Sequence, residues 1–154
     1  MSPEDRMKAI LAKQAEADET KRAEEAAESI ATDQAEAMRA EVTGIWDSKL
    51  KPALLKMIAE ANESMPGGRK LFVQLNGPAH QSSLVVDEIL FSFEDKAVSL
   101  LTKKCTVRIL PDGIVVVSME SHYRRSAKGY NFEALTATED RMKGIVLDYL
   151  EMEL

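Results

Sequence analysis

Residues 104–121 read KCTVRILPDGIVVVSMES, two runs rich in β-branched side chains on either side of the loop PDG at 111–113. This pattern predicts a β-hairpin, for which two loop lengths compete. A three-residue loop pairs Val107 with Val117, whereas a two-residue Asp-Gly loop shifts every partner by one residue. Because such a slip turns the apolar side chains to the wrong face, we expect the three-residue loop, with Gly113 at positive φ.

The predicted hairpin has one apolar face that needs a cover. The face consists of Cys105, Val107, Ile109, Val115, Val117 and Met119. Amphipathic helices predicted at 45–63 and 137–152 can supply this cover, and Thr136 with Glu139 matches a capping box at the start of the second one. The sequence therefore predicts an α+β fold: a long N-terminal helix and a small antiparallel sheet of three to four strands, covered by helices that include a C-terminal helix.

Two further stretches are strand candidates. Residues 70–75 (KLFVQL) are short, and Gly77-Pro78 follows them. Residues 84–93 (LVVDEILFSF) are rich in β-branched and aromatic residues, but their apolar residues also continue at helical spacing as far as 101. We prefer the strand, with a turn at 94–96.

The N-terminal residues form a long charged helix in our interpretation. Ser2 can cap a helix over 3–41 that consists mainly of Ala, Glu, Lys, Arg and Gln. Residues 1–41 hold 11 acidic and 6 basic residues and few large apolar ones. Such a helix has little to bury, so it is either solvated, paired with another helix or frayed. No strict heptad is sustained. We divide the chain into an arm, 1–44, and a compact α+β domain, 45–154.

The helix predicted at 45–63 contains Pro52, which lacks an N–H group. This residue either kinks a continuous helix or lies in the first turn of a new one. In the second case Asp47 or Ser48 can serve as the cap. The residues MPGG at 65–68 should then end the helix.

The bulk composition restricts the classes of function and location. The chain has 154 residues and a net charge of −6, which argues against binding to nucleic acid or anionic membranes over its whole surface. Its only cysteine, Cys105, indicates a reducing compartment. The first residues show no secretory pattern, and no run approaches the roughly 18 apolar residues of a membrane span. We expect a cytoplasmic protein.

The most informative polar stretch is SHYRRSAKGY at 121–130. Bases interleaved with aromatic residues suit a phosphate backbone, stacked bases or an acidic protein surface. The candidate binding residues are Lys104, Arg108, His122, Tyr123, Arg124, Arg125, Lys128 and Tyr130. The alternative, which we favour, is that these cations pair with the acidic helix at 139–153 or with residues 16–41 of the same or a partner chain.

Other reactive residues do not form a recognisable catalytic pattern. Cys105 lies on the inward face of the predicted hairpin, which is typical of a small buried hydrophobic residue. His80 and His122 are 42 residues apart, outside any ligand-spaced cluster. No glycine-rich phosphate loop is present. The sequence thus predicts neither a metal site nor a cofactor, and it favours a protein that is not an enzyme.

Three hypotheses about function follow. The first is an interaction or assembly protein without enzymatic activity, most simply a homodimer formed through the N-terminal helix. The second is binding of nucleic acid or another anionic ligand through 121–130. The third is an enzyme of unknown class with a pocket between sheet and helices, in which His122, Glu120 or Cys105 takes part.

Overall fold

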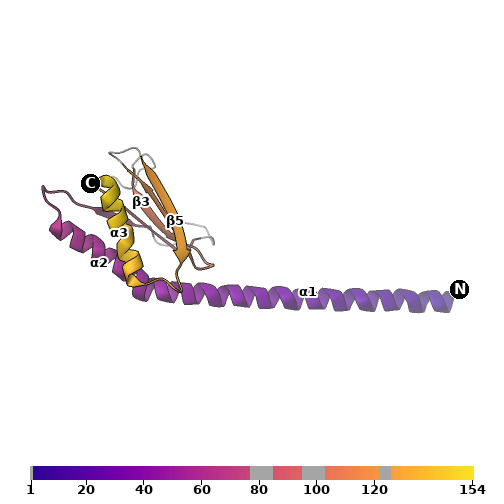
Figure 1. The fold of residues 1–154 in the computed structure, drawn as a ribbon. Helices are drawn as coiled ribbons and strands as arrows, with labels where there is room; N and C mark the ends of the chain where they lie inside the picture. The colour runs from indigo at the N-terminus through magenta and orange to yellow at the C-terminus, as the bar shows by residue number, and fades with distance from the viewer. Residues whose placement is uncertain (1, 77–84, 95–102, 122–125) are drawn as a thin grey trace. The chain divides into compact units, whose positions relative to one another are not determined.

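The structure, a computed structural model, describes residues 2–76, 85–94, 103–121 and 126–154. The chain forms two compact units, Met1–Ala37 and Met38–Leu154, which are treated separately below. The first unit consists of helix. The second combines helices with a sheet, so the predicted α+β fold with a long N-terminal helix is confirmed (Figure 1).

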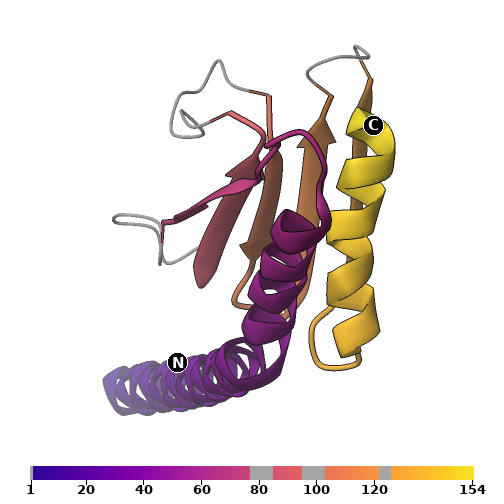
Figure 2. The same cartoon turned by 90° about the vertical axis from the view of Figure 1, so that its left-hand side faces the viewer.

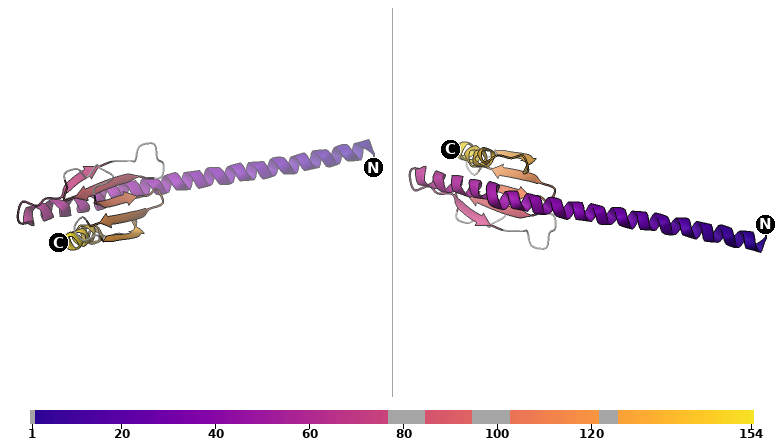
Figure 3. Two further views of the ribbon diagram at one scale, coloured as in Figure 1. Left: turned by 90° about the horizontal axis from the view of Figure 1, so that it is seen from above. Right: turned by 90° about the horizontal axis from the view of Figure 1, so that it is seen from below.

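The N-terminal helical run has three parts. It comprises α1 (Pro3–Ile45), η1 (Trp46–Leu50) and α2 (Lys51–Ser64). Ser2 caps the start as predicted, since its hydroxyl accepts a hydrogen bond from the Asp5 N–H at 3.2 Å. Gly44 lies within α1, and in Figure 3 the ribbon continues through η1 into α2 without a loop.

Pro52 explains the wider π-helical turn of η1. A proline has no N–H to donate, and its ring clashes with the carbonyl group four residues earlier. The helix widens just before it, where the Lys51 N–H bonds to the carbonyl oxygen of Trp46, five residues back. No side chain caps α2, so the predicted cap by Asp47 or Ser48 is wrong. The Ser48 hydroxyl instead donates to the Gly44 carbonyl oxygen at 2.6 Å.

The sheet has five antiparallel strands, one or two more than predicted. The strands are β1 (Phe72–Leu75), β2 (Asp87–Ser92), β3 (Cys105–Ile109), β4 (Ile114–Glu120) and β5 (Ala127–Glu133), in that spatial order. The strand prediction for 84–93 holds over β2. Of the turn expected at 94–96, residues 95 and 96 lie outside the described part of the chain. β5 was not predicted because only Tyr130 and Phe132 are large and apolar in it, and its other residues resemble a loop.

The hairpin β3–β4 has the predicted register. Val107 pairs with Val117, and Cys105 pairs with Met119. The three-residue loop closes through a hydrogen bond from the Leu110 N–H to the Ile114 carbonyl oxygen at 2.9 Å. Gly113 has φ of +92°, the left-handed conformation that the loop requires.

Replacing Gly113 with alanine is expected to lower the free energy of unfolding by about 1–3 kcal/mol, because the new side chain forces a positive φ on an L-residue. Its Cβ would also lie 3.3 Å from Cγ2 of Val42. The matched control is Gly44→Ala, where the added methyl meets nothing within 4 Å in a helix. That change should stabilise the protein by about 0.5–1 kcal/mol. Urea unfolding followed by circular dichroism measures both, and equal shifts would contradict the argument.

Two helices cover one face of the sheet. α2 and α3 (Glu139–Glu153) lie side by side over it, as Figure 2 shows. The residue that caps α3 is Thr138, whose hydroxyl accepts from the Arg141 N–H at 3.2 Å. The predicted capping box with Thr136 is therefore wrong.

The largest side chains that are fully buried in the core include Trp46, Phe91 and Tyr149.

A buried polar network joins the helical run to the sheet. Asp87 begins β2 and is 5% exposed, and its Oδ2 accepts hydrogen bonds from Trp46 Nε1 at 2.7 Å and Lys51 Nζ at 3.0 Å. Its Oδ1 accepts from the backbone N–H of Glu88. The carboxylate is thus paired with a cation and held by two N–H donors, as burial of a charge requires.

Candidate functional site

The basic segment proposed from the sequence is only partly described. His122, Tyr123, Arg124 and Arg125 lie outside the residues that the structure describes. The other four candidates are Lys104, Arg108, Lys128 and Tyr130. They fall into two groups on the sheet.

Lys128 and Tyr130 lie on the face of β5 that α3 covers. The Tyr130 hydroxyl donates a hydrogen bond to Oδ2 of Asp148 on α3 at 2.9 Å, and Lys128 Nζ lies 3.9 Å from the same atom. Burial raises the pKa of Tyr130, and the hydrogen bond to Asp148 raises it further. Both residues therefore contact an acidic residue of the C-terminal helix. Pairing of this kind is the alternative to an external ligand that we favoured from the sequence.

Arg108 extends from the opposite face of the sheet. It pairs through its Nε with a carboxylate oxygen of Glu88 on the neighbouring strand. Lys104 immediately precedes β3 and is partly buried. The structure does not gather the four described candidates at one point, because β-strand side chains alternate between faces.

Arg141, which was not among the candidate residues predicted from the sequence, contacts the aromatic side chains of β5. Its guanidinium carbon lies 4.9 Å from the ring centroids of both Tyr130 and Phe132, within the range of a cation–π contact. Lys128 Nζ is 5.7 Å from the Tyr130 ring. The cations on this side of the molecule therefore help to attach α3 to the sheet edge.

The lone cysteine is a core residue. Cys105 is fully buried, and burial raises the pKa of its thiol well above the usual range, with the charge of Asp148 adding to the increase. A thiol of this kind is a poor nucleophile because the thiolate is the reactive form. Within the described ranges no group of three or more His, Cys, Asp or Glu residues could hold a metal ion.

A groove between the helices carries an excess of positive charge. It has a volume of about 190 Å³ and lies between the η1–α2 run and α3. Its charged lining residues are Lys49, Lys56, Lys143 and Glu139. No spacing in the sequence connects Lys49 and Lys56 with Lys143, which lies 87 residues beyond Lys56.

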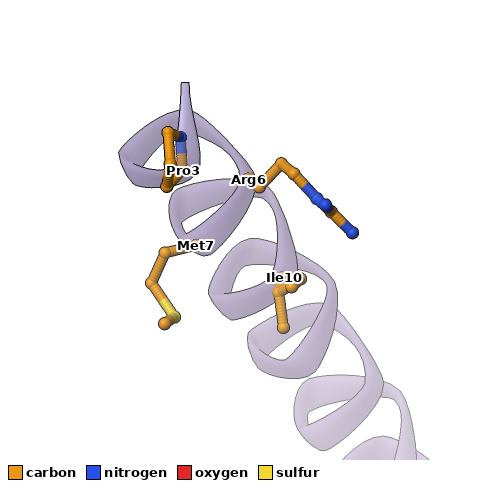
Figure 4. A pocket seen from close by; sticks show the side chains of 4 residues that line it. All are labelled: Pro3, Arg6, Met7 and Ile10. Atoms are coloured by element: carbon orange, nitrogen blue, oxygen red, sulfur yellow. The ribbon is translucent and has the colours of Figure 1, made fainter. Parts of the chain in front are cut away.

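The N-terminal helix presents apolar side chains to solvent. Every residue from 2 to 37 is exposed, and Met7, Ile10, Leu11 and Ile30 are each more than half exposed. A shallow depression lies along the first turns of α1, and Figure 4 shows Met7 and Ile10 there, on the outside of the helix. None of the helices in the described ranges combines the length and the apolar character needed to cross a lipid bilayer.

Comparisons with known protein families, with curated proteins and with solved structures found no match to this chain.

Proposed function

We propose that this chain is an interaction protein that assembles with a second copy of itself through the helix of residues 2–37. The observation that carries the proposal is that every residue of this helix is exposed, including its four large apolar side chains. Because each is between 57% and 60% exposed, burying the rest of each would contribute about 1–2 kcal/mol before the cost of association is subtracted. An assembly role uses this surface without requiring a catalytic group.

The composition of the helix supports pairing with another helix. Alanine is frequent between Ala9 and Ala37, and its small side chain allows two helix axes to approach closely. Met7, Ile10 and Leu11 form one patch near the N-terminus, where a partner helix gains most from contact. The charged residues around them keep the unpaired chain soluble and limit the strength of association.

Analytical ultracentrifugation of the full chain over a range of concentrations tests the proposal. We expect a monomer–dimer equilibrium, and we expect Ile10→Gln/Leu11→Gln to weaken it by at least about tenfold because it removes two apolar contacts per copy. The control is Lys8→Gln/Lys13→Gln, which changes neighbouring exposed residues and leaves the apolar patch intact. A full chain that stays monomeric at every concentration would remove the proposal.

Binding of nucleic acid or another anion through 121–130 stays a prediction. Reversing two charges in Arg124→Glu/Arg125→Glu and measuring oligonucleotide binding at low salt tests it directly. Unchanged binding in that variant would eliminate the basic segment as the binding surface.

A further inference from the structure

We infer that the groove between η1, α2 and α3 binds the phosphate group of a small molecule. Three lysines, Lys49, Lys56 and Lys143, line a groove of about 190 Å³ together with one acid, Glu139. The Ser48 hydroxyl lies in the same wall but donates its proton to the Gly44 carbonyl oxygen, so the lysines supply the hydrogen-bond donors. The site is independent of the N-terminal helix of residues 2–37 and of the segment 121–130.

The lysines of this groove have no protein counterion among the described residues, unlike several other cations of the compact unit. Lys51 pairs with Asp87, and Lys128 lies near Asp148. Among the described residues, Lys49, Lys56 and Lys143 take part in no ion pair. Like charges that share one groove repel each other, and an anion between them relieves that repulsion. A chain with a net charge of −6 has acids to spare, yet it places only Glu139 here.

The three lysines are held on a rigid support. Lys49 and Lys56 are seven residues apart, which is two helical turns, so they lie on the same side of the η1–α2 run. Lys143 is the fifth residue of α3, on the wall that faces this run. Ala53, between the two lysines of the first run, is 7% exposed and belongs to the common core. The two walls of the groove therefore keep their spacing without a ligand.

The chemistry favours a phosphate over a larger polyanion. Lysine ammonium groups bind phosphate as compact point charges with three donors each. Subtracting the Glu139 carboxylate leaves about two positive charges, which matches a phosphate near neutral pH. A nucleic acid would also approach the remainder of a negatively charged protein and be repelled. Inorganic phosphate and a phosphate ester share the required chemistry.

Isothermal titration of the full chain at constant ionic strength tests the site, with inorganic phosphate and glycerol phosphate as two separate probes. We expect saturable binding of at least one probe and a loss of at least about tenfold in affinity for Lys56→Gln/Lys143→Gln. Tighter binding of inorganic phosphate identifies the free ion as ligand, and tighter binding of glycerol phosphate identifies an ester.

The control must remove the same charge elsewhere. Lys70→Gln/Lys103→Gln lowers the net charge equally at residues that do not line the groove, and its affinity should stay within about twofold of the parent because only screened long-range charge is lost. Circular dichroism of both variants checks that they fold. No saturable binding of either probe, or equal losses in the two double variants, would overturn the inference.

Discussion

Replacing Trp46 with alanine is expected to lower the free energy of unfolding by about 3–5 kcal/mol. The indole is fully buried at the start of η1, and its Nε1 donates to the buried carboxylate of Asp87. The variant loses the transfer energy of the ring and leaves a cavity between the helical run and the sheet. Trp46 is the only tryptophan, so urea unfolding must be followed by far-ultraviolet circular dichroism rather than by fluorescence.

A second substitution separates the two contributions of the indole. Trp46→Phe keeps most of the ring volume but removes the N–H donor, so we expect a smaller loss of about 1–3 kcal/mol. Trp46→Ala should thus be clearly worse than Trp46→Phe. If alanine at this position costs less than about 1 kcal/mol, the packing of Trp46 is not what holds the helical run against the sheet.

The part of the fold that the sequence predicted best is the part that local pattern determines. In the β3–β4 hairpin, a one-residue slip would turn apolar side chains to solvent, so Val107 has one acceptable partner, Val117. β5 lacks such a constraint because it is an edge strand with small and polar residues on its outer face. Its place in the sheet depends on Tyr130 and Phe132 packing under α3, a tertiary contact that no local pattern records.

The helix boundaries were missed for a related reason. Thr136 and Thr138 are equally good caps by composition, and only the backbone conformation shows that Thr138 holds the position. Pro52 correctly indicated a disturbance of the helix, but it did not indicate that the disturbance would be a π-helical turn. A wider π turn satisfies the backbone with Lys51 bonding to Trp46, and it needs no side-chain cap.

The candidate sites depend on the fold even more strongly. Lys128 and Tyr130 were proposed for an external ligand together with Arg108, but strand alternation places Arg108 on the other face of the sheet. The lysine groove shows the opposite case. Lys56 and Lys143 are far apart in sequence and come together only because α2 and α3 are neighbours. No spacing of residues could have indicated that groove.

The second large effect on stability is expected at Asp87, whose carboxylate accepts a hydrogen bond from the Trp46 indole. Replacing Asp87 with leucine is expected to lower the free energy of unfolding by about 2–4 kcal/mol, because removing one partner leaves the other buried groups unpaired. Asp87 is 5% exposed and accepts hydrogen bonds from Trp46 and Lys51 on one oxygen. The Lys51 side chain is 27% exposed and can turn toward water, which keeps the expected loss below that of a fully buried pair.

Two further variants decide whether the loss of stability comes from the hydrogen bonds that Asp87 accepts or from the loss of one negative charge alone. Asp87→Asn keeps an acceptor oxygen for the indole N–H, so about half of the loss should be recovered. Glu88→Gln removes an adjacent carboxylate but keeps a side-chain oxygen for the hydrogen bond from Asn76. It loses the ion pair with Arg108, whose side chain is 54% exposed, and it should cost about 1 kcal/mol. Trp46 fluorescence follows unfolding in all three variants and should change its emission in the folded state only when Asp87 is altered. Equal losses for Asp87→Leu and Glu88→Gln would show that the buried carboxylate has no special role in joining η1 to β2.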